Sequence, residues 1–351
     1  MPHESILAHL APLLTNQIEN VATDALAHLL LQYLFLADAF REFVSSAGVD
    51  LPDNLAFNTQ SRGLDTAIPD LVGIDTEGRY ILIIESKFWA PLTPNQPGTY
   101  IKRLPPDRPA ILLFVAPASR QLTLWPELLN GCSSLTSQPD ARAGSFLTVR
   151  LNSRHLLALT SWEAILAALY DKANQERDEF AAGDVWQLQS LCTKVDAEAF
   201  HPLSEDEITA PTGKRKVQLR GLLDDLVRQL AEKGIISTEG YRATPGPRSY
   251  KRYMSIRGLP NSDWCLEYNE ELQKHSPATV LWLSATETPQ SSEIFARGAV
   301  EHLHIRKQYL IPLEIPINVE REAILSSLYS QVIAIVSKPG FSGLPHDPQR
   351  S

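Results

Sequence analysis

Cysteine is scarce in this chain, and the cysteines present lie far apart. Cys132, Cys192 and Cys265 form no Cys-x-x-Cys pair, which argues against a disulfide framework and against a cysteine zinc site. Long apolar runs are also missing: the most apolar stretch, 26–40, contains His, Gln and Asp and is too short to span a bilayer. The first residues lack the basic and apolar regions of a signal peptide. These absences predict a cytoplasmic protein that does not enter a membrane.

Positive charge is in deficit as well. The chain has 32 Lys and Arg against 41 Asp and Glu, a net charge of −9, which argues against a protein that coats nucleic acid without specificity. A local basic groove is still compatible with this total. The length of 351 residues is enough for a large core and predicts two domains.

The segment that organises the first half reads as a β-hairpin. Two β-rich apolar runs, 71–74 and 80–84, flank the turn-forming residues 75–78. A turn centred on Thr76 or Glu77 would place Asp70 opposite residues 83–85. The hairpin therefore predicts that Asp70 lies close to Glu85.

Acidic and basic groups are expected to converge where this hairpin ends. Side chains alternate along a strand, so Glu85 and Lys87 should share one face while Ser86 points away. Hard cations such as Mg²⁺ take oxygen ligands from one or two carboxylates, and a lysine beside them can stabilise charge on a phosphoryl group. The simpler alternative is a buried strand whose exit happens to be charged.

These residues resemble a known nuclease motif. Pro69-Asp70 and Glu85-Ser86-Lys87 match the motif of the PD-(D/E)xK nuclease superfamily. The resemblance implies an α/β, restriction-endonuclease-like mixed sheet flanked by helices, and a Mg²⁺ or Mn²⁺ cofactor. It also implies that Asp70 and Glu85 bind the metal, and that Lys87 supports the attacking water or the transition state.

Three further residues extend the resemblance. Residues 16–44 have helical periodicity, and Glu19 lies where RecB-like nucleases carry a metal-site glutamate, although a carboxylate there could simply favour the helix dipole. Gln96 and Tyr100 resemble the Q-x-x-x-Y motif of RecB-type nucleases, in a segment where a short helix is predicted from about 97 to 104. The alternative for that pair is a helix cap and a core tyrosine. Gln60 and Arg62, in the loop before Asp70, could face a substrate.

The remaining pattern sets the predicted domain boundaries. Strands are expected at 110–116 and 145–151, and a helix capped by Ser161 at 161–170. We expect a nuclease-like domain over 1–172, a helical connection and linker over 173–215, and a second, α+β domain over 216–340, with a terminal helix from Asn318.

The second domain contains one basic segment. Residues 241–257 hold five basic residues, three tyrosines and no acid, which suits contact with a phosphate backbone and stacking on bases. A solvated hairpin with core tyrosines is the alternative. The candidate nucleic-acid-binding residues are Arg248, Tyr250, Lys251, Arg252 and Tyr253.

Taken together, the motifs favour a metal-dependent nuclease that hydrolyses DNA phosphodiester bonds. Its overall arrangement resembles bacterial defence-associated nucleases, which implies a role in anti-phage defence or DNA processing. Two alternatives remain: a degenerate nuclease fold kept as a nucleic-acid-binding or assembly module, and a nuclease acting on RNA. A homo-oligomer or a protein partner is compatible with either.

Overall fold

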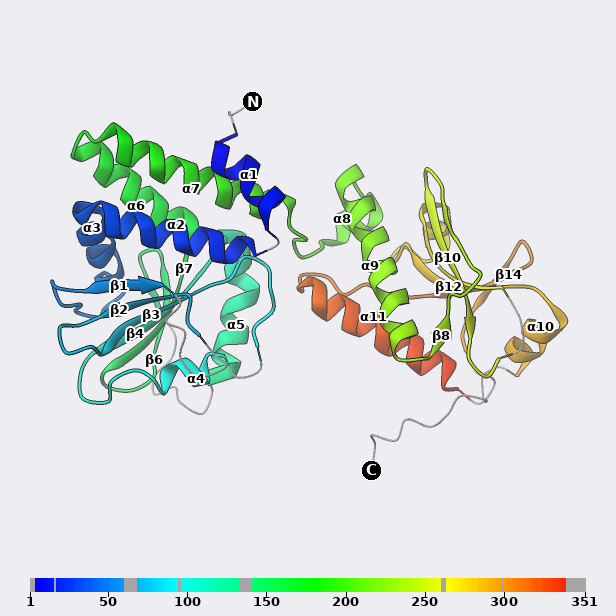
Figure 1. Ribbon diagram of the computed structural model, residues 1–351. Helices are drawn as coiled ribbons and strands as arrows, with labels where there is room; N and C mark the ends of the chain where they lie inside the picture. The colour runs from blue at the N-terminus through cyan, green and yellow to red at the C-terminus, as the bar shows by residue number, and fades with distance from the viewer. Residues whose placement is uncertain are drawn as a thin grey trace. The chain divides into compact units, whose positions relative to one another are not determined.

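A computed structural model of the chain divides it into two compact units, Met1–Ala199 and Phe200–Ser351 (Figure 1). The residues that the structure describes are 4–15, 17–59, 68–93, 96–132, 141–259, 263–297 and 300–338. Among them, no helix is both long and apolar enough to cross a membrane.

The first unit is built on a mixed sheet of seven strands. Its central strands β3, β4 and β7 are parallel, and the outer pairs are antiparallel. The order across the sheet is β1 (Ala56–Thr59), β2 (Leu71–Ile74), β3 (Tyr80–Ser86), β4 (Ala110–Ala116), β7 (His155–Ser161), β6 (Phe146–Arg150) and β5 (Ala141–Ala143). The expected mixed α/β sheet is therefore confirmed.

Helices cover both faces of this sheet (Figure 1). Alternation along the strands explains the two layers, because Leu82 and Ile84 enter one core while Ile83 enters the other. One face packs against α1 (Ile6–Leu14), α2 (Ile18–Gln32), α3 (Leu34–Ser45), α6 (Trp162–Gln175) and α7 (Glu179–Glu198). The other packs against α4 (Gly98–Ile101) and α5 (Gln121–Cys132), the latter preceded by the short helix η1 (Ala118–Arg120).

The predicted hairpin is confirmed as β2 and β3. Leu71 pairs with Ile84 and Val72 with Ile83, which is the register expected from the turn. Asp75 closes the turn by accepting hydrogen bonds from the backbone N–H groups of Glu77 and Arg79, both at 2.9 Å. Asp70 thus stands directly before β2 and faces the end of β3.

Two helix predictions for the first unit need correction. The expected helix 16–44 is two helices, because Tyr33 adopts extended backbone angles between α2 and α3 and its hydroxyl donates to Asp184 on α7 at 2.8 Å. The helix expected over 97–104 is only the single turn α4. Pro97 precedes this turn as its N-cap instead of occupying its first position.

The boundary between the units also differs from the prediction. The first unit ends at Ala199 and not at residue 172, because α7 buries Val185, Leu188 and Leu191 in the core of the first unit. Segment 173–215 is therefore not a connection throughout: it contains all of α7, the short helix α8 (Glu205–Thr209) and the first residues of α9 (Gly213–Glu232).

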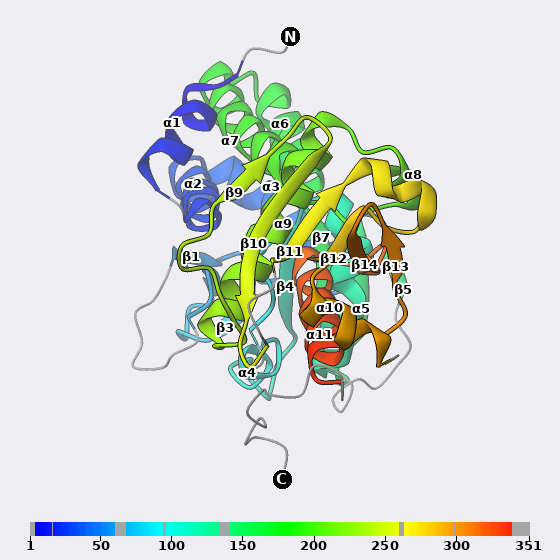
Figure 2. The same ribbon diagram turned by 90° about the vertical axis from the view of Figure 1, so that its right-hand side faces the viewer.

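The second unit is an antiparallel sheet with helices packed on one face (Figure 2). Helices α9 and α11 (Arg321–Val336) supply buried residues to its core. The last helix was predicted to start from Asn318, but Asn318 has a positive φ of 56° and Glu320 is the N-cap. The order of strands is β13 (Leu303–Ile305), β14 (Gln308–Pro312), β12 (Leu281–Thr286), β11 (Trp264–Asn269), β10 (Ser249–Ile256) and β8 (Ile236–Ser237), with β9 (Ala243–Pro245) also on β10. Two short helices, η2 (Glu270–His275) and α10 (Pro289–Ala296), lie between strands of this sheet in the chain.

Candidate active site

Asp70 is held over the end of β3 by hydrogen bonds to one residue. Its Oδ2 accepts from the backbone N–H of Ser86 at 2.8 Å and from the Ser86 hydroxyl at 3.1 Å. The pairing of Leu71 with Ile84 brings these groups together. Ser86 was expected only to point away from the site, but it fixes the orientation of the Asp70 carboxylate.

Glu85 and Lys87 form a buried ion pair beside Asp70. The Lys87 Nζ lies 2.8 Å from Glu85 Oε1. Lys87 is 9% exposed and Glu85 is 3% exposed. The other carboxylate oxygen, Glu85 Oε2, is buried and has no hydrogen-bond partner among the described residues. A buried carboxylate oxygen without a donor is costly and is suited to a ligand.

Glu19 reaches the same place from the first turn of α2. Its Oε1 accepts from the backbone N–H of Phe88 at 2.6 Å. Its charge interacts with those of Lys87 and Asp70. Glu19 was predicted either as a metal-site residue or as a carboxylate that only favours the helix dipole. The second role does not account for these contacts.

Gln96 and Tyr100 are also brought into contact with the cluster. Gln96 Nε2 lies 2.8 Å from Glu85 Oε1 and 3.1 Å from the Tyr100 hydroxyl oxygen. Tyr100 is buried, and its hydroxyl donates to the carbonyl of Ile68 at 3.2 Å. The pair therefore positions Glu85 from the side of the sheet that α4 covers. Gln60 and Arg62 lie outside the described residues.

The electrostatics show crowded carboxylates around one cation. Burial raises the pKa of Asp70 to about 6, with a further contribution from the Glu85 charge, and burial also raises the pKa of Glu19. Burial alone would lower the pKa of Lys87, but Glu85, Glu19 and Asp70 together leave it above its usual value. Lys87 is thus a protonated cation at neutral pH, and the carboxylates are short of positive charge.

The residues present suit a hard divalent cation in their chemistry. Asp70, Glu85 and Glu19 offer oxygen ligands, and the buried Glu85 Oε2 lacks a donor. Within the described residues, no group of three or more Asp, Glu, His or Cys side chains is placed so that it could hold a metal ion. An open site with one or two carboxylates, such as Asp70 and Glu85, is the arrangement that Mg²⁺ commonly uses, because it keeps water and phosphate oxygens as its other ligands.

Sequence reasoning missed a buried arginine and an aromatic ring next to the cluster. Arg120 is fully buried after β4, and its Nη1 donates to the carbonyl of Phe88 at 3.0 Å. Its guanidinium lies 5.7 Å from the ring centre of Trp89, whose Nε1 donates to Asp196 at 2.9 Å. The one available signal was the position of Arg120 just after a buried strand, because loops at the carboxyl ends of parallel strands often carry site residues.

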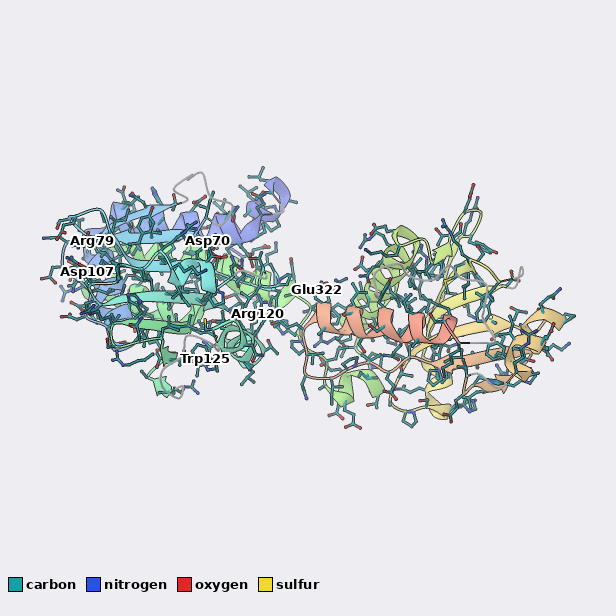
Figure 3. The ribbon with its side chains drawn as sticks, turned by 90° about the horizontal axis from the view of Figure 1, so that it is seen from below. Asp70, Arg79, Asp107, Arg120, Trp125 and Glu322 are labelled. Atoms are coloured by element: carbon teal, nitrogen blue, oxygen red, sulfur yellow. The ribbon has the colours of Figure 1, made fainter. Side chains whose placement is uncertain are left out.

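The cluster lies at one end of the first unit. Figure 3 shows Asp70 and Arg120 toward one end, and Arg79 with Asp107 at the other. Arg79 directly precedes β3, which runs from Tyr80 to Ser86. Arg79 and Ser86 therefore lie at opposite ends of this strand. The ion pair between Arg79 and Asp107, at 3.3 Å, is therefore separate from the candidate site.

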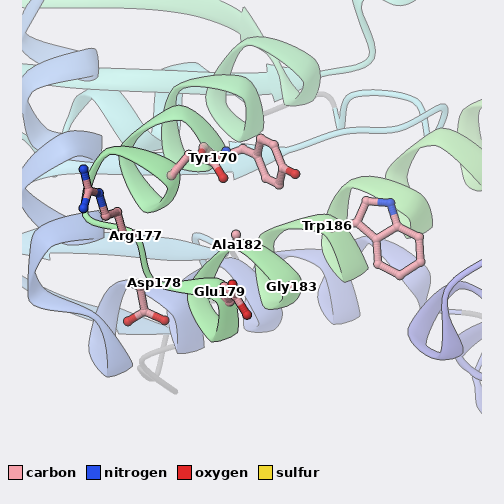
Figure 4. A pocket seen from close by; sticks show the side chains of 8 residues that line it. Tyr170, Arg177, Asp178, Glu179, Ala182, Gly183 and Trp186 are labelled. Atoms are coloured by element: carbon pink, nitrogen blue, oxygen red, sulfur yellow. Dashed lines mark hydrogen bonds between the residues drawn. The ribbon is translucent and has the colours of Figure 1, made fainter.

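Two hollows open at opposite ends of α7. A cavity of about 650 Å³ is lined by Glu19, Phe88 and Trp89 and adjoins the carboxylate cluster. A second hollow of about 570 Å³ lies between α6 and the first turns of α7, where Tyr170, Arg177 and Trp186 line it (Figure 4). Because a helix of 20 residues is about 30 Å long, the second hollow does not belong to the candidate site.

The basic segment of the second unit is a hairpin in which the three basic residues predicted to bind nucleic acid are already paired with acids. Strands β9 and β10 are antiparallel, as expected for a hairpin. Arg248 lies 3.6 Å from Glu270, Lys251 lies 3.1 Å from Glu267, and Arg252 pairs with Asp224. Tyr250 also donates to Asp224, at 2.7 Å, and Tyr253 is partly buried. These acidic partners come from β11, η2 and α9, and they offset the local excess of positive charge.

Comparison with known proteins adds no assignment. No family model, curated protein or solved structure matches the chain. The functional argument therefore depends on the geometry of the first unit.

Proposed function

We propose that the first unit is a metal-dependent nuclease that hydrolyses DNA phosphodiester bonds. The observation that carries this proposal is convergence: side chains from α2, the hairpin and the segment entering α4 meet at the end of the sheet, where hydrogen bonds or an ion pair hold each of them. The residues are those named from the motif resemblance: Glu19, Asp70, Glu85, Lys87, Gln96 and Tyr100. The simpler alternative, a buried strand whose end happens to be charged, does not explain why these side chains lie together.

The sheet supports a restriction-endonuclease-like fold as part of this proposal. An antiparallel hairpin, β2 and β3, leads into the parallel strand β4, and helices lie on both faces. The candidate residues stand where β3 ends, next to the end of the parallel neighbour β4. In α/β sheets, this edge is where ligands commonly bind.

Asp70 and Glu85 would hold Mg²⁺ or Mn²⁺, with Glu19 as an additional ligand. When bound, such a cation acts as a Lewis acid toward phosphoryl oxygens. Gln96 keeps the Glu85 carboxylate oriented through its 2.8 Å hydrogen bond, and Ser86 does the same for Asp70. Both acidic ligands are thus preorganised by neighbours.

Lys87 supplies positive charge and does not act as a base. Its pKa lies above the usual value because of Glu85 and the other carboxylates, so the ammonium group keeps its proton at neutral pH. A fixed cation next to the reacting phosphate stabilises the negative charge that develops there. A conformational change that releases Lys87 from Glu85 is not required for this role.

A cleavage assay with the purified full chain tests the proposal. Linear, circular and single-stranded DNA, and RNA of the same sequence, are incubated with Mg²⁺, with Mn²⁺ or with EDTA. We expect cleavage of DNA that EDTA abolishes, and a loss of about 100-fold or more in Glu85→Gln and in Lys87→Met. Asp107→Asn is the matched control, because Asp107 is an exposed acid at the opposite end of the first unit.

Each outcome has a defined meaning. No metal-dependent cleavage by the wild-type chain contradicts the enzyme proposal and leaves the non-catalytic module. Cleavage of RNA and not of DNA favours the ribonuclease alternative. Equal loss in Asp107→Asn and Glu85→Gln would show that charge removal anywhere impairs the protein, and the site assignment would then be wrong.

A further inference from the structure

A cavity beside the candidate site has the size of a ligand pocket. Its volume is about 650 Å³, within the range of about 300 to 1,000 Å³ that is usual for small-molecule sites. It shares Glu19 with the carboxylate cluster. The walls come from the start of α2, the segment after β3 and the end of α7, and include Ile18, Glu19, Asn20, Phe88, Trp89 and Glu198.

The aromatic wall of this cavity is fixed in place. Trp89 is partly exposed, and its Nε1 donates to Asp196 Oδ1 at 2.9 Å. The guanidinium of the fully buried Arg120 lies over the ring, 5.7 Å from its centre. Arg120 is itself held by the carbonyl of Phe88. A ring held from two sides loses little freedom when a flat ligand stacks on it.

The charged side chains that line the cavity favour a neutral ligand over a phosphate. The described lining residues include two carboxylates, Glu19 and Glu198, and neither lysine nor arginine. A phosphate in this cavity would meet like charge. A nucleobase is neutral and flat, and proteins that bind single strands stack bases on aromatic rings.

We propose that this cavity receives one unpaired nucleobase, stacked on Trp89, while the adjoining phosphate lies at the carboxylate cluster. The proposal rests on the nuclease function proposed above and narrows its substrate class to single-stranded or frayed nucleic acid. A base inside a duplex must first be unpaired and unstacked, which costs free energy that a single strand does not pay. Single strands should therefore bind and react better than closed duplex.

A double-mutant cycle between protein and DNA tests the stacking. The full chain carrying Glu85→Gln, which prevents cleavage, is titrated with a fluorescent single strand and with strands in which one nucleotide at a time is abasic. Trp89→Leu should weaken binding of the intact strand about 5- to 150-fold. In the protein with Trp89, removing the base at one particular position of the strand should weaken binding by a similar factor. In the Trp89→Leu protein, removing that same base should leave the affinity almost unchanged. Trp89→Phe should retain most of the affinity because it keeps a ring.

Glu198 provides an independent arm of the test. Its side chain is exposed at the edge of the cavity, so Glu198→Gln should leave the fold intact. If the occupant is a neutral base, this substitution changes affinity little. If the occupant is a phosphate, removing the negative charge should tighten binding and make it more dependent on salt, and that result would overturn the proposal.

The failures can be told apart. Additive effects of Trp89→Leu and the abasic positions, or equal affinity for closed duplex and single strand, refute the base pocket even when the wild-type chain cleaves DNA. If the wild-type chain shows no metal-dependent cleavage but the effects of Trp89→Leu and of the abasic position are not additive, the nuclease proposal is refuted and the base pocket is supported. Absence of any binding refutes the pocket. Thermal unfolding of Trp89→Phe and Trp89→Leu shows whether a weakened variant is still folded.

Discussion

The crowding of carboxylates at the candidate site should reduce the stability of the metal-free protein, and Asp70 allows this cost to be measured. The pKa of Asp70 rises from 3.8 to about 6 because of burial and the Glu85 charge. The folded protein then binds the Asp70 proton more tightly than the unfolded chain does. The contribution of Asp70 to stability must therefore fall as the pH rises from about 4 to about 6, and its full cost is present above that range.

The magnitude follows from the size of the shift. A rise of about two units corresponds to about 3 kcal/mol, since each unit is worth about 1.4 kcal/mol. Asp70 is partly exposed and its titration is coupled to a neighbour, so solvent screening reduces the effect. We expect about 1 to 3 kcal/mol of lost stability above pH 6.

Asp70→Asn is the perturbation that isolates this charge. The amide oxygen can still accept the two hydrogen bonds from Ser86, but the side chain does not titrate. In EDTA, the variant should be more stable than the wild type by about 1 to 3 kcal/mol at pH 8 and about equally stable at pH 4. Glu19, whose pKa is also raised, makes a contribution of the same sign in both proteins.

Urea unfolding at several pH values measures the difference. Adding Mg²⁺ at pH 8 should stabilise the wild type more than Asp70→Asn, because ligand binding to the folded state adds stability in proportion to its affinity. The result that refutes the reasoning is the same dependence of unfolding free energy on pH in both proteins. In that case the carboxylates do not repel one another as the geometry indicates.

Three further predictions concern two residues of the candidate site and one ion pair of the second unit. Glu19→Gln should raise the Mg²⁺ concentration needed for half-maximal cleavage about 10- to 100-fold, and an unchanged metal titration would restore the helix-dipole role. Gln96→Leu should lower the rate of cleavage with little change in melting temperature, as a comparison of kinetics and thermal unfolding would show, because the Gln96 amide orients Glu85. Lys251→Ala should destabilise the second unit by about 3 kcal/mol, measured by urea unfolding, since Glu267 is fully buried and would lose its cation.

The part of the site that could be predicted from sequence is the part set by short-range geometry. The turn at 75–78 fixes the hairpin register, and alternation along β3 puts Glu85 and Lys87 together. These rules connect residues fewer than 20 positions apart. Gln96 and Tyr100 belong to the same local stretch, and the resemblance of their spacing to a known motif was enough to suggest them.

The part that could not be predicted depends on long-range packing. Trp89 meets Asp196 across more than 100 residues because α7 joins the first unit. The same packing explains why the first unit ends at Ala199 and not at the predicted residue 172. Nothing local in 173–215 distinguishes a connection from a helix that belongs to the core, since the apolar spacing of α7 is the same in either case. Helical periodicity also failed to show the break at Tyr33, because the apolar pattern continues on both sides of it.

The basic segment of the second unit shows why a local count of charge is a poor guide to a surface. Lys251 is directly opposite Glu267 in the β10 and β11 register, and Arg252 meets Asp224 from α9. Counted along the chain, residues 241–257 hold no acid, yet their partners lie on elements 20 or more residues away or on the neighbouring strand. Charge that is already paired across strands contributes less to phosphate binding, because each new contact must displace an existing carboxylate. A phosphate-binding role for this hairpin therefore requires Arg248 to act as the main contact, since it is the most exposed of the three and has the longest ion pair.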